Sequence, residues 1–263
     1  MRGLSSARAI QQCWLRRSPV VPRRTLLTQA RVQGPGTPPL LEETIGENFA
    51  RIVSQHGDRN AVISREQGRR STYRQLDEES NVLARGLQSL GVKKGDRVCV
   101  SLGNNMEFAT LTYALFKLGA ILVPLNPAFT DKQIAAAFNV LSATHLVIGA
   151  ETNLPYKKPR SNLSILESLV PDLHSSQVQS PLIASLQHVI VLDNSAGRID
   201  VSGYKALKPF SSLTQDSDAS AVTPSEKLVN TDLINIQFTS GTTSAHNIVR
   251  GEQHTRADLV SIV

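Results

Sequence analysis

Cysteine is scarce in this chain of 263 residues, which contains only Cys13 and Cys99. If the segment around Cys13 is removed, Cys99 has no partner, so we expect no intramolecular disulfide and a reducing compartment. The six histidines show no metal-ligand spacing with cysteine or with one another. We therefore expect no zinc site.

An uninterrupted apolar run of membrane-spanning length is also missing. The nearest approach, "FATLTYALFKLGAILVPL" at residues 108–125, is interrupted by Lys117, Gly119 and Pro124. Glycine favours the end of a helix, and the β-branched residues that follow Gly119 favour a strand. We expect a helix that ends at Gly119, then a short buried strand, and no transmembrane segment.

Acidic residues and lysine are absent before Glu42, whereas the same segment contains seven arginines. It also contains serines, and its apolar residues are spaced so that several can share one helical face. This composition is typical of a mitochondrial transit peptide, so we predict a disordered transit peptide over residues 1–36 and a location in the mitochondrial matrix. A disordered basic tail is the alternative interpretation, with a peroxisomal or cytoplasmic location.

The rest of the chain is close to neutral. The formal charge is +6, and removing the seven arginines from the 28 basic residues leaves 21 against 22 acidic residues. Hydrophobic residues make up 40% of the chain and charged residues 19%, as in soluble globular proteins. Because the positive charge is confined to one end, we expect no nucleic-acid partner.

Helices and strands are expected to alternate after Glu42. Two helix starts carry capping-box patterns, Thr72 with Gln75 and Thr130 with Gln133. Residues 193–227 are rich in serine, aspartate and glycine, which predicts a surface connection with little regular structure. The expected helices are 44–55, 72–91, 106–119 and one that begins at 130. A hairpin is expected over 61–72, with its turn at Gln67–Gly68. The other expected strands are 98–102, 121–125, 145–149, 188–192 and 233–238.

The strands after the hairpin are continuous apolar runs rather than alternating ones. Such runs, separated by helices, indicate a parallel sheet that is covered on both faces. The predicted fold class is therefore α/β, with a mostly parallel sheet flanked by helices.

A cluster of hydroxyl groups follows the last expected strand, in "INIQFTSGTTSAHNIVRG" at residues 234–251. Gly241 tolerates positive φ, so consecutive N–H groups can form an anion-binding nest beside four hydroxyls. This position, after a buried strand, is where open α/β sheets bind ligands. The loop lacks the second glycine and the Lys-Ser/Thr pair of a P-loop, so its residues alone leave two interpretations, a polyphosphate site and an ordinary turn.

Three motifs in order resemble the adenylate-forming superfamily, which includes the acyl-CoA synthetases. "QFTSGTT" is similar to the phosphate loop of that family, and "STYRQLDEESNVLARGLQSLGVKKGDRVCV" and "ALFKLGAILVPLNP" resemble two of its upstream motifs. The resemblance runs from about Glu42 to Thr243. It implies that residues 42–243 form part of an AMP-binding N-terminal domain.

In that family a carboxylate attacks the α-phosphate of ATP, and the thiol of CoA then displaces AMP. The resemblance implies ATP, Mg²⁺ and CoA as cofactors and a carboxylic acid, of the fatty acid type, as substrate. The loop would hold the outgoing phosphates with Mg²⁺ and stabilise the leaving pyrophosphate. Its residues are Thr239, Ser240, Gly241, Thr242 and Thr243.

The two upstream motifs have structural interpretations, so they yield no catalytic candidate. Gly95 and Asp96 are expected to shape a turn, and Asn126–Pro127 is expected to end a strand. The catalytic residues stay unknown from the sequence.

The resemblance stops soon after the loop. The family continues with a Pro-Lys pair, whereas no lysine follows Lys227 here, and residues 244–263 form a divergent tail. A short piece lost between Ala245 and His246, a shifted reading frame or a retained intron would each explain the departure.

The resemblance also implies that the adenine contacts, the acyl pocket and the C-terminal domain with its catalytic lysine lie outside this sequence. We therefore expect an inactive fragment of an acid:CoA ligase with an exposed sheet edge. The alternatives are a non-catalytic isoform that acts as a binding partner and a different adenylating enzyme of the same superfamily.

Overall fold

The computed structural model describes residues 41–154, 157–215, 218–238 and 248–252. The predicted transit peptide, the loop Thr239–Thr243 and most of the tail lie outside the described residues. No described helix has both the length and the apolar character needed to cross a membrane.

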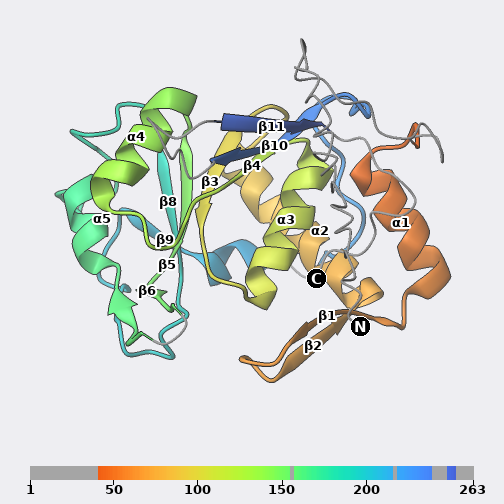
Figure 1. Cartoon of the computed structure of the whole chain (residues 1–263), viewed down its shortest axis with the longest axis horizontal. Coiled ribbons are helices and arrows are strands. Elements are labelled where there is room, and N and C mark those ends of the chain that lie inside the picture. The colour runs from red at the N-terminus through yellow and green to blue at the C-terminus, as the bar shows by residue number, and fades with distance from the viewer. Residues whose placement is uncertain (1–40, 155–156, 216–217, 239–247, 253–263) are drawn as a thin grey trace, which may run out of the picture. The chain divides into compact units, whose positions relative to one another are not determined.

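A sheet of seven strands forms the centre of the described chain (Figure 1). Every neighbouring pair is parallel except β10 with β11, which is antiparallel, so the predicted mostly parallel sheet is confirmed. The order is β11-β10-β4-β3-β5-β8-β9. The strands are β3 Arg97–Ser101, β4 Ile121–Pro124, β5 His145–Gly149, β8 His188–Leu192, β9 Leu207–Pro209, β10 Leu233–Phe238 and β11 Ile248–Glu252.

Helices cover both faces of this sheet, as the continuous apolar strands predicted (Figure 1). On one face, α2 and α3 pack on Val147 of β5; on the other, α4 and α5 pack on Leu146 and Ile148. Successive side chains of a strand point to opposite faces, so β5 contributes to both cores. The helices are α1 Ile45–His56, α2 Tyr73–Ser89, α3 Met106–Leu118, α4 Asp131–Leu141 and α5 Leu163–Leu169.

The helix boundaries follow from local capping. Both predicted capping boxes are present, at Thr72 for α2 and at Thr130 for α4, and each threonine accepts a hydrogen bond from the backbone N–H three residues later. A threonine cap of this kind stabilises a helix by about 1 kcal/mol. At the other end of α3, Gly119 adopts φ 69°, the left-handed conformation that glycine accepts most readily.

Two small antiparallel ribbons lie outside the main sheet. The predicted hairpin is β1 Asn60–Ser64 with β2 Arg69–Thr72, and Gly68 in its turn has φ 63°. The second ribbon pairs β6 Glu151–Thr152 with β7 Arg160–Ser161 directly after β5. Elements as short as β6, β7 and α5, with two, two and seven residues, could not be predicted from residue patterns.

A surface connection with little regular structure was predicted over residues 193–227. This prediction was wrong for residues 207–214, in the middle of the segment. There, β9 extends the main sheet beside β8, and the 3₁₀ helix η1 (Phe210–Thr214) buries Phe210 and Leu213 against α2 and α3. Three residues that include a proline are too short a run to be recognised as a strand. At the other end of the sheet β11 pairs with β10, so β11 rather than β10 is the end strand among the described residues.

Candidate functional site

The carboxyl ends of five parallel strands meet at one edge of the sheet. The chain leaves β3, β4, β5, β8 and β10 at this edge, and β10 is aligned with β4 through Asn235 and Leu122. Phe238 therefore ends β10 at the edge where open α/β sheets bind ligands. The predicted site residues Thr239–Thr243 follow immediately but lie outside the described residues.

Asn194, in the loop after β8, holds two of these strand ends together. Its Oδ1 accepts a hydrogen bond from the backbone N–H of Glu151 at 2.9 Å, and its Nδ2 donates to the Glu151 carbonyl at 2.8 Å. A Cβ at Gly149 would lie 2.9 Å from Nδ2 of Asn194, so a larger side chain would displace this bridge. Close packing against Asn194 therefore requires a glycine at the end of β5.

A second buried amide ties the next loop to the same edge. Nδ2 of Asn162 donates to the Gly149 carbonyl at 2.9 Å, and its Oδ1 accepts from Oγ1 of Thr152 at 2.8 Å. The same Thr152 hydroxyl lies 3.2 Å from the Pro127 carbonyl, so its single proton is shared between the two acceptors. Satisfied buried networks of this kind rigidify a structure, so the loops after β4, β5 and β8 form a fixed frame.

The buried carboxylate at this edge is paired with a guanidinium. Glu151 is buried, and its two carboxylate oxygens accept from Nε and Nη2 of Arg198 at 3.2 and 2.7 Å. The Glu151 carboxylate raises the pKa of the Arg198 guanidinium, first through this hydrogen bond and then through its charge. Glu151 would therefore repel an anionic ligand at this edge less than an unpaired carboxylate would.

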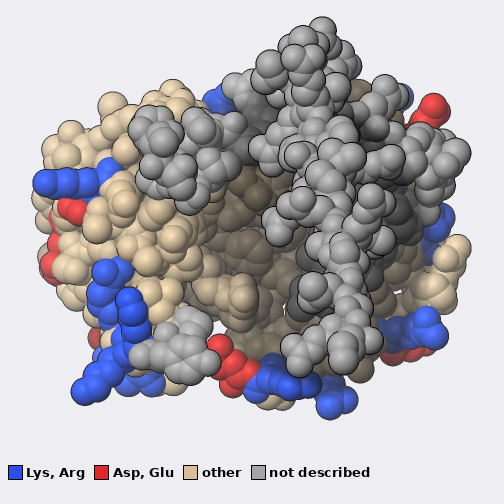
Figure 2. Space-filling model, viewed as in Figure 1, with Lys and Arg blue, Asp and Glu red and all other residues tan. Residues whose placement is uncertain are grey.

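The β6–β7 ribbon carries the basic side chains of this edge. Lys157, Lys158 and Arg160 are exposed and follow the carboxyl end of β5. Lys and Arg side chains gather at the lower left of the face in Figure 2, the side on which Figure 1 places β6, while the described centre of that face is formed mostly by uncharged residues. We call these three residues the basic ribbon.

The two upstream motifs have the structural roles expected of them. Oδ2 of Asp96 accepts from the Lys93 N–H at 3.0 Å, and Gly95 adopts φ 81°, which makes a turn before β3. Oδ1 of Asn126 accepts from the Ala128 N–H at 2.9 Å just after β4. Both are local backbone contacts.

The N-terminus of α3 also lies close to this edge, but it is already capped. Asn105 accepts from the Phe108 N–H at 2.8 Å, and Gln67 from the β1–β2 turn accepts from the Met106 N–H at 2.8 Å. Glu107 stands in the same turn of the helix. These contacts leave this helix end poorly suited to a phosphate group.

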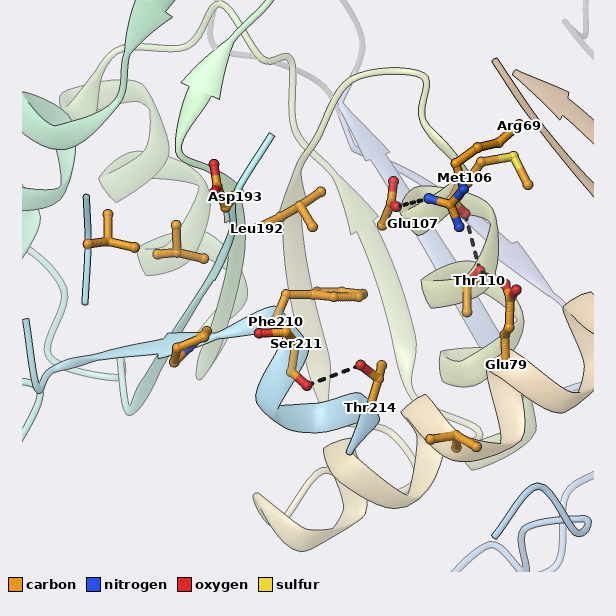
Figure 3. Close-up of a pocket in the computed structure, with 14 residues that line it drawn as sticks. Arg69, Glu79, Met106, Glu107, Thr110, Leu192, Asp193, Phe210, Ser211 and Thr214 are labelled. Carbon is orange, nitrogen blue, oxygen red and sulfur yellow. Dashed lines mark hydrogen bonds and ion pairs between the residues drawn. The ribbon is translucent and has the colours of Figure 1, made fainter. Parts of the chain in front are cut away.

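A groove of about 470 Å³ opens between α2 and α3 on one side and β8, β9 and η1 on the other (Figure 3). Arg69 in its wall is paired with Glu107 at 2.6 Å. Burial raises the pKa of Glu107, but hydrogen bonds from Gln67 and Arg69 outweigh it, so the net pKa is lowered. The full lining is Arg69, Glu79, Val82, Met106, Glu107, Thr110, Val191, Leu192, Asp193, Val201, Pro209, Phe210, Ser211 and Thr214.

Three carboxylates and one guanidinium make this groove net negative. It therefore does not suit a phosphate or a carboxylate substrate, although Leu192 at the end of β8 and Met106 at the start of α3 place it beside the carboxyl edge of the sheet. The roles of Asn162 and Asn194 and the hydrogen bond between Gln67 and Glu107 were not predicted from the sequence. These contacts join residues that are 13 to 43 positions apart in the sequence, and a single asparagine or glutamine forms no recognisable motif.

Residues 49–246 match the family of AMP-binding enzymes. The chain belongs to this family. The match spans every strand of the described sheet except β11 and ends just past the hydroxyl loop, so the three motifs that suggested the resemblance all lie within it.

Curated relatives in the AMP-binding family are acyl-CoA ligases. The acyl-CoA ligase SID4 of Ajellomyces capsulatus is 32% identical over 218 residues, which cover 81% of this chain and 34% of the relative. The mitochondrial medium-chain acyl-CoA ligase ACSF2 of Danio rerio is 28% identical over 241 residues, covering 87% of this chain and 38% of the relative. The chain thus spans little more than a third of the length of these relatives.

The fold is shared with solved AMP-binding enzymes. The anthranilate CoA ligase AuaEII in complex with anthranoyl-AMP has a TM-score of 0.63 at 19% identity, over 81% of this chain and 35% of that chain. At this identity the likeness concerns the fold alone. It agrees with the parallel sheet and its flanking helices.

Proposed function

We propose that this chain is part of an ATP-dependent acid:CoA ligase. Such an enzyme joins a carboxylate to the α-phosphate of ATP with release of pyrophosphate, and then transfers the acyl group from AMP to the thiol of CoA. The observation that supports this proposal is the path of β10, which runs parallel to β4 and ends at Phe238, one residue before the hydroxyl loop. Membership of the AMP-binding family supports it further.

In this proposal Thr239, Ser240, Gly241, Thr242 and Thr243 bind the β- and γ-phosphates together with Mg²⁺. Backbone N–H groups in a nest and hydroxyl donors would stabilise negative charge as pyrophosphate leaves. The pairing of Glu151 with Arg198 beyond the carboxyl end of β5 is compatible with this role, since an unpaired buried carboxylate at this edge would repel the nucleotide. We assign no catalytic residue.

The basic ribbon is the group of described residues best suited to the phosphates of CoA. Its three exposed cations lie just beyond the carboxyl end of β5, on the same edge as the end of β10. Lysine binds phosphate as a point charge and arginine as a planar fork, so the ribbon offers both modes.

For the substrate we propose a fatty acid, and for the location the mitochondrial matrix. The printed names of the Danio rerio and Mus musculus relatives include both "medium-chain acyl-CoA ligase" and "mitochondrial". The arginine-rich segment 1–36 independently favours the same compartment.

Phosphate binding is tested on the full chain with pyrophosphate in the presence of Mg²⁺. We expect a Kd of about 1 mM, which corresponds to a binding free energy of about 4 kcal/mol. The backbone NMR chemical shifts that change on binding should be centred on residues 239–243. Gly241→Val should abolish these shifts, because a β-branched residue opposes positive φ. The matched control is Gly203→Val, since a Cβ at Gly203 meets nothing within 4 Å. Shifts that persist unchanged in Gly241→Val would refute the site.

The reaction itself is tested on the full-length ligase of which we propose this chain to be a part. ATP, CoA and a panel of medium- and long-chain fatty acids are supplied, and acyl-adenylate and acyl-CoA are measured by mass spectrometry. We expect acyl-adenylate with at least one acid. Its absence with every acid would contradict the ligase proposal.

A non-catalytic binding partner is the second candidate function. The observation that favours it is the absence of any lysine after Lys227, which leaves the hydroxyl loop without the cation that follows it in the family. Pyrophosphate binding without adenylate formation, together with co-purification of an intact relative, would favour this candidate.

A further inference from the structure

The groove between α2, α3 and η1 has a chemical character that the ligase proposal does not use. Its lining includes five large apolar residues, Val82, Met106, Leu192, Val201 and Phe210, which we call its floor. A concave site of a few hundred Å³ with an apolar floor and a few polar groups is typical of small-molecule sites. The volume of about 470 Å³ falls within this range.

The charged groups that line the groove are mainly carboxylates, which attract cations. Three carboxylates line it, and they come from three different elements: Glu79 from α2, Glu107 from α3 and Asp193 from the loop after β8. Arg69 is the only basic side chain among the lining residues, and it already bonds to Glu107, whose other oxygen accepts from Gln67 at 2.9 Å.

The other two carboxylates have only neutral hydrogen-bond donors. Glu79 accepts from the hydroxyl of Thr110 at 3.3 Å, and Asp193 accepts from the N–H and hydroxyl of Ser195 at 2.9 and 2.7 Å. The Ser195 hydroxyl bond is the largest cause of the lowered pKa of Asp193, which is therefore ionised at neutral pH. Both residues are exposed, so the negative charge stands at the mouth of the groove.

An aromatic ring completes the arrangement. Figure 3 shows the ring of Phe210 projecting toward α3, on the side of the groove that carries Thr110 and Glu79. Ammonium groups are attracted both to carboxylates and to the faces of aromatic rings. The apolar floor, the aromatic ring and the carboxylate of Glu79, which accepts from a hydroxyl, together complement a molecule with an apolar body and a positively charged end.

We propose that this groove binds a small organic cation, an alkyl- or arylammonium compound whose apolar body lies on the floor and whose ammonium group lies between Glu79 and Phe210. Its ligand has the opposite charge to the pyrophosphate proposed for the hydroxyl loop, and it is tested with different probes. The proposal therefore stands or falls independently of the ligase function.

Three probes with the same phenyl body and different charge test the proposal on the full chain. The cationic 2-phenylethylamine should bind with a Kd of about 1 mM or tighter, as measured by isothermal titration calorimetry at low ionic strength. The neutral 2-phenylethanol should bind about two- to fivefold more weakly, and the anionic 3-phenylpropanoate should not bind in the groove. Raising the salt concentration should weaken amine binding only.

The decisive variant is Glu79→Gln, which removes one charge and keeps the side-chain shape. It should weaken amine binding about two- to fivefold while leaving the affinity for 2-phenylethanol unchanged. The matched control is Glu167→Gln, an exposed carboxylate on α5 outside the groove, which should change nothing.

Three results would overturn the proposal. They are equal affinity for all three probes, equal loss of amine affinity in both glutamine variants, and no amine binding at 10-fold the expected Kd. Self-association of the chain that disappears in Glu79→Gln would instead assign the groove to a second copy, and it would overturn the proposal as well.

Discussion

His145 shows how a single buried side chain couples this fold to pH. It begins β5, is only 3% exposed, and stacks on His188 of β8 with ring centroids 4.8 Å apart. Nδ1 lies 2.8 Å from the Thr144 hydroxyl, while Nε2 has no hydrogen-bond partner among the described residues. A buried imidazole with one unsatisfied nitrogen accepts a second proton only at a cost in stability.

We predict that His145 makes the protein less stable in acid. Burial, followed by the charge of His188, lowers the pKa of His145 from 6.5 to about 4. Between these two values the unfolded chain binds the proton more tightly than the folded chain, so stability is complete above about pH 6.5 and falls as the pH drops toward 4. The loss should be about 3 kcal/mol, which urea unfolding across this pH range measures.

The control for this prediction removes the imidazole but keeps a flat ring. His145→Phe should flatten the pH dependence between pH 6.5 and 4, whereas the exposed His56→Phe should retain it. If both variants keep the wild-type slope, another group is responsible for the acid sensitivity.

At the scale of elements, the fold depends on close contacts that residue patterns only partly reveal. The strands β3, β4, β5, β8 and β10 and the helices α1 to α4 could be predicted, because apolar runs, capping boxes and Gly119 are local signals. β9 and η1 could not, because their stability comes from tertiary contacts: Phe210 and Leu213 fill space under α2 and α3. At the candidate site, the hydroxyl loop was found from its residue types, whereas the frame around Asn194 depends on contacts between distant residues.

Gly86 provides a test of this tertiary contact. It lies in α2, and a Cβ at this position would come within 2.2 Å of the Leu213 carbonyl oxygen in η1. We predict that Gly86→Ala destabilises the protein by about 1–3 kcal/mol through overpacking, although alanine is the better helix former by about 1 kcal/mol. Thermal unfolding measures the change.

The matched control for Gly86 is Gly46→Ala in α1. The nearest atom to a Cβ at Gly46, Oγ1 of Thr44, lies 3.9 Å away, so this substitution should be neutral or stabilising. Equal effects of the two substitutions would show that η1 does not pack against α2 as closely as described.

At the scale of the whole molecule, charge and family membership divide the chain into parts with different roles. The family match covers residues 49–246, and all seven arginines of the first 41 residues precede it. We propose a transit peptide over residues 1–36, a partial AMP-binding domain over 42–243 and a divergent tail over 244–263. The near-neutral remainder explains why the net positive charge of the chain does not by itself indicate an anionic partner.

The first part of this division can be tested directly. Residues 1–40 fused to a fluorescent reporter should carry it into mitochondria, with processing between about Arg24 and Gly36. Replacing Arg16, Arg17 and Arg23 by glutamine should abolish import, because import of such segments depends on positive charge on an amphipathic helix. A matched fusion in which three serines or threonines of the same segment are replaced by glutamine should still be imported. A cytosolic reporter of unprocessed size would favour the basic-tail interpretation, and it would remove the sequence support for a matrix enzyme.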